Sequence, residues 1–231
     1  MNSSPIIMIT GATAGFGEAC ARLFAKAGWR LIITGRRLER LQSLQAELGG
    51  ASQVCISCFD ISDRQATEQA FAELPEEFQQ IDVLVNNAGL ALGLEPAYAT
   101  DPADWERMVD TNIKGLMRCS RLVLPGMQSR DRGYIINIGS VAGNWPYPGG
   151  NVYCASKAFV RQFSLALRAD LLGTQIRVTN IEPGNAETEF SIVRFKADEQ
   201  RAEKVYENTV ALTAQDIADT IWWLVNTPAH M

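Results

Sequence analysis

The sequence predicts an α/β fold in which a doubly wound parallel sheet, covered by helices on both faces, forms a single domain over residues 1–231. Three observations support this prediction. Short apolar runs rich in β-branched residues alternate six times with longer stretches of helical periodicity. Such alternation is typical of βαβ units, whose crossover helices cover both faces of a parallel sheet. The chain has 231 residues, 47% of them hydrophobic, which suffices to bury one sizeable core.

Each predicted strand is followed by a predicted helix, with a variable segment between the last strand and the last helix. We expect strands at residues 5–10, 30–34, 53–59, 81–85, 134–138 and 176–181, and helices at 15–27, 37–48, 63–74, 103–127, 152–172 and 214–225. Gly28 and Gly49 stand where helices should end. Asp101 followed by proline is a typical helix start, and the residues from Thr213 to Asp216 form a capping box.

The composition excludes several classes of partner. The formal net charge is -5, so the chain lacks the overall basic character with which proteins bind nucleic acids or anionic membranes. Its longest apolar runs are far shorter than the roughly 20 residues of a membrane span, and the N-terminus lacks a basic segment followed by a cleavage site. We therefore expect a cytoplasmic protein with a small-molecule substrate and no nucleic-acid or membrane partner.

The cysteines do not predict a disulfide framework or a metal site. There are five, an odd number, and they are spread widely along the chain. Cys55 and Cys58 form a C-x-x-C, but they lie in a predicted strand, where side chains three positions apart point to opposite faces. A redox or metal pair would need a turn or a helix start there. We expect reduced thiols and no bound metal.

A glycine-rich turn follows the first predicted strand. The stretch "TGATAGFG", Thr10 to Gly17, places Gly11, Gly15 and Gly17 just before a helix. Glycines at such a turn let the backbone approach a pyrophosphate and leave the phosphates at the positive end of the helix. Ligands of open parallel sheets bind beyond the carboxyl ends of the strands, where this turn lies. The alternative is an ordinary tight loop between a strand and a helix.

Two arginines follow the second predicted strand. Sites for NAD usually place an acidic residue here, whereas the 2′-phosphate of NADP needs positive charge. Arg36 and Arg37 therefore favour NADP, although two solvated arginines opening a helix are the alternative. Asp60, after the third strand, is expected either to accept a hydrogen bond from the adenine amino group or to cap the next helix.

Five motifs in this order resemble the short-chain dehydrogenase/reductase family. They are the glycine-rich turn, "NNAG" at 86–89, Asn112 in "DTNIKG", Ser140, and Tyr153 with Lys157 in a Y-x-x-x-K pattern. The resemblance runs from about Ile6 to Thr227 and implies a Rossmann fold. Three loop stretches, "GLALGLEPA", "GNWPYPGGNVYCASKAFVRQFS" and "TEFSIVRF", resemble the bacterial NADP-dependent 3-hydroxy acid dehydrogenases of the serine and L-allo-threonine type.

The tyrosine and lysine explain how the chain can move protons without a histidine in its core. Its one histidine, His230, is the next-to-last residue. Residues four apart on a helix lie on one face with a rise of about 6 Å, so Lys157 should lie beside Tyr153. A phenol has a reference pKa of about 10, which a nearby ammonium and an oxidised nicotinamide would lower.

The family resemblance also implies roles for these residues. Tyr153 takes the hydroxyl proton in oxidation and returns it in reduction, while Ser140 hydrogen-bonds the same substrate oxygen. Lys157 lowers the pKa of Tyr153 and binds the nicotinamide ribose. Asn112 lies at a local helix bend that lets a water connect its backbone to Lys157.

Further residues are implied for the cofactor and the substrate. The cofactor would be bound by Gly11, Thr13, Gly15, Phe16, Gly17, Arg36, Arg37, Asp60, Ile61, Asn87, Tyr153, Lys157, Pro183, Gly184 and Thr188. The segment after Thr188 would close over the site as a lid. A carboxylate in a partly dry pocket needs a cation, for which Arg194 is the candidate, unless this arginine faces outward. Trp145, Tyr147 and Phe190 either form the wall of the substrate pocket or simply pack its loops.

Two departures from the family pattern concern the nicotinamide contact and the sheet edge. Asn185 stands where the relatives usually carry an apolar residue after Pro-Gly. The chain ends at "NTPAHM", whereas the relatives continue into a seventh strand and a tail that contribute to the sheet edge and to subunit contacts. We expect a homo-oligomer, which is a tetramer in the relatives, with this assembly in question here.

Three functions remain open from the sequence. The first is NADP-dependent oxidation of the 3-hydroxyl of small 3-hydroxy acids such as serine, L-allo-threonine and 3-hydroxypropionate, with the reverse reduction of 3-oxo acids or semialdehydes. The second is NADPH-dependent carbonyl or 3-oxoacyl reduction of bulkier substrates. The third is an NADP-sensing binding protein without turnover. Proteins of that third kind typically lack the tyrosine or the lysine, both of which are present here.

Overall fold

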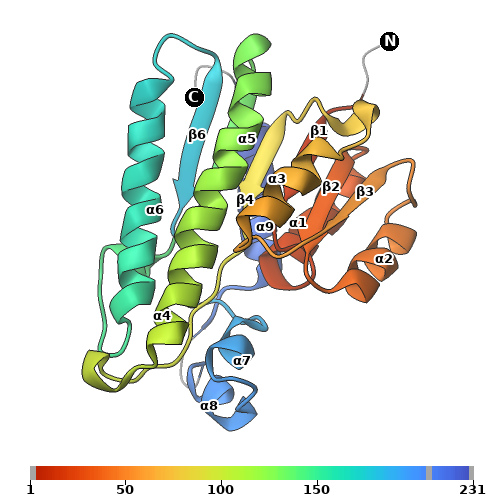
Figure 1. The fold of residues 1–231 in the computed structure, drawn as a ribbon. Helices are drawn as coiled ribbons and strands as arrows, with labels where there is room; N and C mark the ends of the chain where they lie inside the picture. Colours follow the sequence, from red (N-terminus) through yellow and green to blue (C-terminus); the bar gives the residue numbers. More distant parts are fainter. Residues whose placement is uncertain (1–3, 207–209, 229–231) are drawn as a thin grey trace.

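The computed structural model, which describes residues 4–206 and 210–228, confirms the predicted α/β fold with one parallel sheet (Figure 1). Its six strands are β1 (Ile6–Ile9), β2 (Arg30–Gly35), β3 (Val54–Cys58), β4 (Val83–Asn86), β5 (Gly133–Ile138) and β6 (Ile176–Ile181). The strand order is β3-β2-β1-β4-β5-β6, so the winding direction reverses between β1 and β4. A reversal of this kind opens a crevice beyond the carboxyl ends of the strands.

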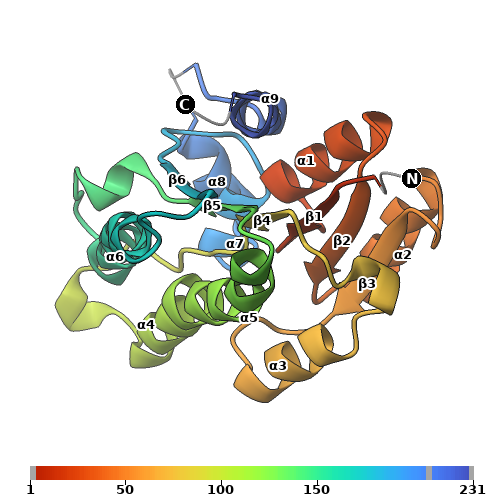
Figure 2. The same cartoon turned by 90° about the horizontal axis from the view of Figure 1, so that it is seen from above.

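Helices cover both faces of the sheet, as Figure 2 shows from above. One face carries α1 (Gly15–Lys26), α2 (Leu38–Glu47) and α9 (Ala214–Val225). The other carries α3 (Arg64–Ala72), α4 (Pro102–Val109) continued by α5 (Leu116–Ser129), and α6 (Asn151–Asp170). Two short helices, α7 (Phe190–Arg194) and α8 (Glu199–Lys204), lie beyond the carboxyl ends of the strands, where they can cover a site (Figure 1).

The central strands are apolar on both sides because each face packs against helices. In β1, Ile7 and Ile9 belong to the core under α1 and α9, whereas Ile6 and Met8 belong to the core under α3 and α5. All four side chains are buried. Alternating side chains therefore fill two separate cores, which is why the strand is a continuous apolar run in the sequence.

The predicted helix boundaries hold to within two residues, with one informative exception. Asp101 and Thr213 cap α4 and α9 as expected. The helix predicted at 103–127 is interrupted by a π-helical segment, Asp110–Gly115, between α4 and α5. Such insertions often occur at functional sites, and this one contains Asn112, where a local bend was predicted.

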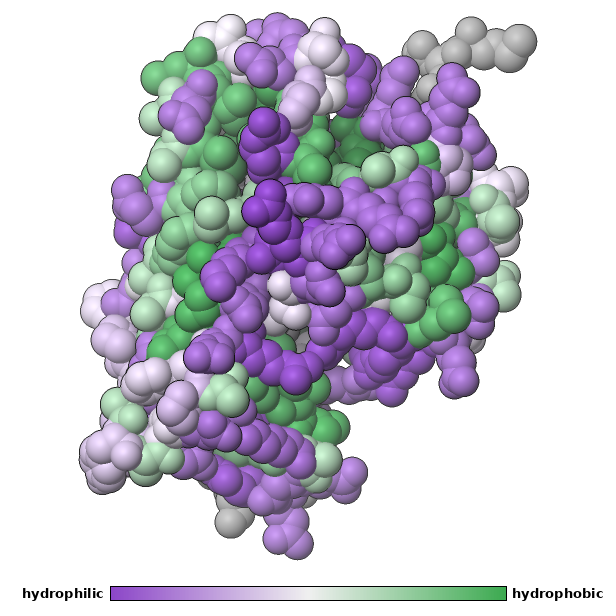
Figure 3. Space-filling model, in the orientation of Figure 1, coloured by the Kyte–Doolittle hydropathy of each residue, from purple (hydrophilic) through white to green (hydrophobic). Residues whose placement is uncertain are grey.

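The surface is largely hydrophilic. On the face seen in Figure 3, apolar residues form separate patches among the hydrophilic ones. Met117 on α5 and Leu165 on α6 are among the exposed apolar side chains. Within the described part of the chain, no helix combines the length and the apolar character that crossing a bilayer requires.

Candidate active site

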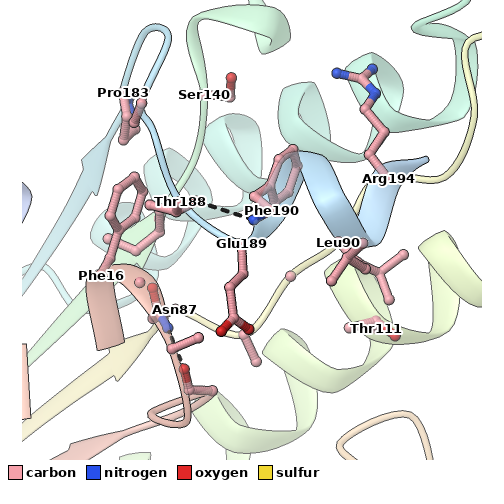
Figure 4. Close-up of a pocket in the computed structure, with 18 of the residues that line it drawn as sticks. Phe16, Asn87, Leu90, Thr111, Ser140, Pro183, Thr188, Glu189, Phe190 and Arg194 are labelled. Atoms are coloured by element: carbon pink, nitrogen blue, oxygen red, sulfur yellow. Dashed lines mark hydrogen bonds between the residues drawn. The ribbon is translucent and has the colours of Figure 1, made fainter. Parts of the chain in front are cut away.

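A cavity of about 580 Å³ lies beyond the carboxyl ends of the strands, between the sheet and α7 (Figure 4). It extends from Arg36 and Arg37 at one end to Tyr153 and Arg194 at the other. The residues implied from the sequence that form its wall are Gly11, Thr13, Gly15, Phe16, Arg36, Arg37, Asp60, Ile61, Asn87, Ser140, Trp145, Tyr147, Tyr153, Lys157, Pro183, Gly184, Thr188, Phe190 and Arg194. Gly17 and Asn112 are not part of the wall and support it from behind.

The glycine-rich turn is packed so tightly that only glycine fits at Gly17. A Cβ atom there would lie 2.5 Å from the carbonyl oxygen of Gly11 and 2.6 Å from Nδ2 of Asn87. The Asn87 amide donates to the carbonyl oxygens of Thr10 and Gly11 at 2.8 and 3.0 Å. The side chain of Asn87, the residue after β4, therefore holds the turn in place and also lines the cavity.

The start of α1 fits a bound pyrophosphate. Gly11 and Gly15 have φ angles of 68° and 56°, which favour glycine. No side chain caps the helix at Ala14, so its first backbone N–H groups remain available to an anion. A Cβ on Gly15 would meet the side chain of Thr188 at 3.4 Å, so the turn and the lid segment approach each other across the site.

The arginines at the end of β2 form ion pairs around the predicted 2′-phosphate position. Nη1 of Arg36 lies 3.4 Å from Oδ2 of Asp60, and Oδ1 of Asp60 accepts a hydrogen bond from the Ser62 hydroxyl. The capping alternative for Asp60 is wrong, because the side chain that caps α3 is that of Asp63. The bonds from Ser62 and the Arg36 guanidinium hold the pKa of Asp60 below its usual range despite partial burial.

Two residues that were not predicted from the sequence, Glu189 and Arg40, contribute to this end of the site, and of the two Glu189 lines the cavity. Arg37 donates to Thr13 at 2.8 Å and to Glu189 at 2.9 Å. Arg40, one turn further along α2, donates to the other oxygen of Glu189 at 2.7 Å. The spacing of Arg37 and Arg40 could have indicated that both face the same way, but nothing in the sequence indicated Glu189 as their partner.

Tyr153 and Ser140 lie together at the opposite end. Tyr153 is buried on α6, Ser140 follows β5, and both line this end of the cavity, where the Tyr153 ring packs 5.7 Å from that of Phe190. Burial raises the pKa of Tyr153 to about 12, against the smaller lowering effect of Ser140. The chain alone therefore holds this phenol in its protonated form.

The ammonium group of Lys157 is hydrogen-bonded to a backbone carbonyl and not to the Tyr153 hydroxyl. Its Nζ donates to the carbonyl oxygen of Ile138 at 2.7 Å and lies 5.9 Å from the centre of the Tyr153 ring. The two residues share a helix face as predicted. In the chain alone burial is the largest influence on the pKa of Tyr153, so a lowering of that pKa by Lys157 and an oxidised nicotinamide stays a prediction for the complex with the cofactor. Burial also lowers the pKa of Lys157 to about 8, which leaves it mostly charged at neutral pH.

Asn112 connects three elements behind the cavity. Its amide oxygen accepts from the Leu90 N–H at 2.9 Å, and its amide nitrogen donates to the Leu90 carbonyl at 2.8 Å and to Ser156 at 3.1 Å. A Cβ atom on Gly89 would lie 3.4 Å from Asn112 Oδ1 and 3.5 Å from Lys157 Nζ. The ends of the Asn112 and Lys157 side chains therefore both lie beside Gly89. Asn112 thus connects the loop after β4, the π-helical segment and α6.

Arg194 faces the cavity from the end of α7, so the outward-facing alternative is wrong. Its guanidinium carbon lies 5.2 Å from the ring centre of Tyr147 and 5.6 Å from that of Tyr153. Nε donates to the Gly93 carbonyl at 3.3 Å, and Nη2 donates to the Tyr147 hydroxyl. Trp145 is 77% exposed and lies at the mouth of the cavity rather than deep in its wall.

Asn185 ties the lid segment to the rest of the chain. Its side chain donates to the carbonyl of Val205 at 3.1 Å, and its backbone carbonyl accepts from Leu212 at 2.8 Å. These bonds join the two ends of the segment that contains α7 and α8. The polar side chain at this position, where the relatives usually carry an apolar residue, therefore stabilises the lid segment.

The chain is similar to known dehydrogenases in both sequence and structure. A family model for short chain dehydrogenases matches residues 5–199. The NADP-dependent 3-hydroxy acid dehydrogenase YdfG of Salmonella typhi is 60% identical over 227 residues, which are 98% of this chain and 91% of that protein. Sulfoacetaldehyde reductase 2 of Chromohalobacter salexigens is 51% identical, over 99% of this chain and 91% of that protein. A solved closed form of serine dehydrogenase complexed with NADP+ is 58% identical, covers 98% of this chain and 91% of its own, and superimposes with a TM-score of 0.95.

Proposed function

The chain belongs to the short-chain dehydrogenase family and is an NADP-dependent oxidoreductase, and we propose that it oxidises small 3-hydroxy acids at the 3-hydroxyl group. Serine, L-allo-threonine and 3-hydroxypropionate are the proposed substrates, and the matching 3-oxo acids or semialdehydes are substrates of the reverse reaction. The observation that supports this proposal is the position of Arg194 beside Tyr153.

A charged anchor at this distance suits a short substrate. In a 3-hydroxy acid, two carbon–carbon bonds separate the carboxylate carbon from the carbon that bears the reacting hydroxyl. Arg194 keeps its Nη1 nitrogen and one Nη2 hydrogen without a hydrogen bond among the described residues, so a carboxylate can be bound bidentately. With the carboxylate held there, the 3-oxygen would be directed toward the hydroxyl groups of Tyr153 and Ser140, which line the same cavity.

The proposed roles of the chain's residues follow from this geometry. Tyr153, protonated in the chain alone, donates its proton to the carbonyl oxygen in reduction and takes the hydroxyl proton in oxidation. Ser140 holds the same oxygen by a hydrogen bond. Lys157, mostly charged at neutral pH, supplies positive charge to the site, and Asn112 keeps its surroundings in place.

NADP fits the remainder of the cavity. The glycine-rich turn and α1 would hold the pyrophosphate, Arg37 the 2′-phosphate, and Lys157 with Thr188 the nicotinamide end. When bound, its nicotinamide exchanges the hydride with the substrate carbon, and its positive charge in the oxidised state lowers the pKa of Tyr153.

A close alternative differs only in the anionic group of the substrate. Because a relative is a sulfoacetaldehyde reductase, a short aldehyde with a sulfonate in place of the carboxylate is a second candidate. The three oxygens of a sulfonate can accept the same hydrogen bonds from Arg194. Assembly as a homo-oligomer and a cytoplasmic location remain predictions from the sequence.

A substrate panel tests the proposal. We expect serine, L-allo-threonine and 3-hydroxypropionate to reduce NADP+ and to reduce NAD+ at least about tenfold less efficiently, since the arginines favour a 2′-phosphate. The measurement is the absorbance of the reduced nicotinamide, with sulfoacetaldehyde and a bulky 3-oxoacyl thioester tested against NADPH. Turnover of the thioester alone would contradict the proposal.

A further inference from the structure

Glu189 satisfies the two arginines at the 2′-phosphate end of the cavity. One carboxylate oxygen accepts from Arg37 at 2.9 Å, and the other accepts from Arg40 at 2.7 Å. The hydrogen bond from Arg37 is the largest cause that holds the pKa of Glu189 below its usual range. At neutral pH this position therefore has an anion from the chain itself.

The same two arginines are also held by Thr13, a residue of the glycine-rich turn. Arg37 donates from Nε and Nη2 to the Thr13 hydroxyl at 3.1 and 2.8 Å, and Arg40 donates to the Thr13 carbonyl at 3.3 Å. Thr13 and Glu189 both line the cavity. The carboxylate thus lies where the arginines, the glycine-rich turn and the lid segment meet.

Glu189 belongs to the lid segment and is directed away from the substrate end. It lies between Thr188, which faces Gly15, and Phe190, which packs on Tyr153. Figure 4 shows Glu189 and Arg194 extending from the two ends of α7 in opposite directions. The helix α7 therefore presents a positive charge, Arg194, at the substrate end of the cavity and a negative charge, Glu189, at the cofactor end.

A phosphate and a carboxylate require the same feature from an arginine, which is a fork of N–H donors with positive charge. We propose that Glu189 is an internal competitor of the adenosine 2′-phosphate for Arg37 and Arg40, and that it limits the affinity for NADP. The proposal rests on the assignment of Arg37 to the 2′-phosphate. It follows that the phosphate must displace the carboxylate or share the arginines with it, whereas NAD, which has no phosphate there, leaves the pairs intact.

The test measures cofactor binding without turnover. Titration calorimetry of the full chain with NADP+, NAD+ and 2′,5′-ADP is expected to show that Glu189→Gln lowers the Kd of NADP+ and of 2′,5′-ADP about three- to tenfold, while the Kd of NAD+ changes less than about twofold. The factor is modest because the ion pairs are partly exposed. It should shrink in about 0.5 M salt, which screens such pairs.

Glu187→Gln is the matched control, since Glu187 is exposed two residues away and carries the same charge. It should leave all three dissociation constants unchanged. Unchanged or weaker NADP+ binding by Glu189→Gln would overturn the proposal, because Glu189 would then hold the arginines ready for the phosphate. Arg37→Gln separates the assumptions: if it does not weaken 2′,5′-ADP binding, the arginine assignment itself is wrong.

Discussion

Replacing Tyr153 by phenylalanine is expected to lower kcat about a thousandfold while leaving NADPH binding within about twofold of the unchanged protein. General acid–base groups contribute about 10²- to 10⁴-fold to rates, and the hydroxyl of Tyr153 is the group that exchanges the proton in the proposed mechanism. The ring remains to pack against Phe190, 5.7 Å away, so the cavity should keep its shape. Steady-state rates and an NADPH titration on the same preparation measure both effects.

A second tyrosine gives a control for the loss of a hydroxyl group. Tyr134 is buried on β5 and bonds Thr179 through its hydroxyl at 2.7 Å, away from the cavity. Tyr134→Phe should keep kcat within about twofold. If Tyr153→Phe retained a kcat within tenfold of the unchanged protein, Tyr153 would not be the acid and base, and the mechanism would be wrong.

Arg194→Gln is expected to lower kcat/KM for carboxylate substrates about a hundredfold. Hydrogen bonds to charged groups contribute about 1.5–3 kcal/mol each, and about 1.4 kcal/mol corresponds to a factor of ten. The methyl ester of serine, which lacks the carboxylate charge, should lose less than about threefold. The ratio of the two kcat/KM values, measured with NADP+, isolates the effect on the anionic group.

The control for this arginine lies in the same lid segment. Arg201, on α8, stacks on Phe195 and approaches Glu95 at 3.6 Å without reaching the cavity. Arg201→Gln should leave the ratio of the kcat/KM values for serine and its methyl ester unchanged. Equal losses on acid and ester in Arg194→Gln would show that the arginine supports the lid through Gly93 and Tyr147 and does not bind the carboxylate.

The fold and the catalytic end of the site were predictable because their signals are local. Strands buried on both faces are continuous apolar runs, and a spacing of four residues places Tyr153 and Lys157 on one helix face. The helix bend predicted at Asn112 corresponds to a π-helical segment. In each case the neighbours along the chain determine the local geometry.

Contacts between distant segments were not predictable in the same way. Glu189 meets Arg37 and Arg40 across about 150 positions of sequence, and one glutamate in a polar segment carries no signal of such partners. The partner of Lys157 is a backbone carbonyl at the end of β5, which depends on how deeply α6 packs against the sheet. The pKa of Tyr153 likewise follows from burial, which the spacing of residues does not reveal.

The most direct test of the central claim is to follow the hydrogen that leaves the substrate. Serine deuterated at C3 is incubated with NADP+ and the full chain, and the NADPH that forms is analysed by mass spectrometry. Oxidation at the 3-hydroxyl predicts NADPH that is heavier by one deuterium, because the hydride comes from C3. Unlabelled NADPH, or no NADPH from serine, L-allo-threonine or 3-hydroxypropionate while the cofactor still binds, would contradict the assignment of this site to 3-hydroxy acids.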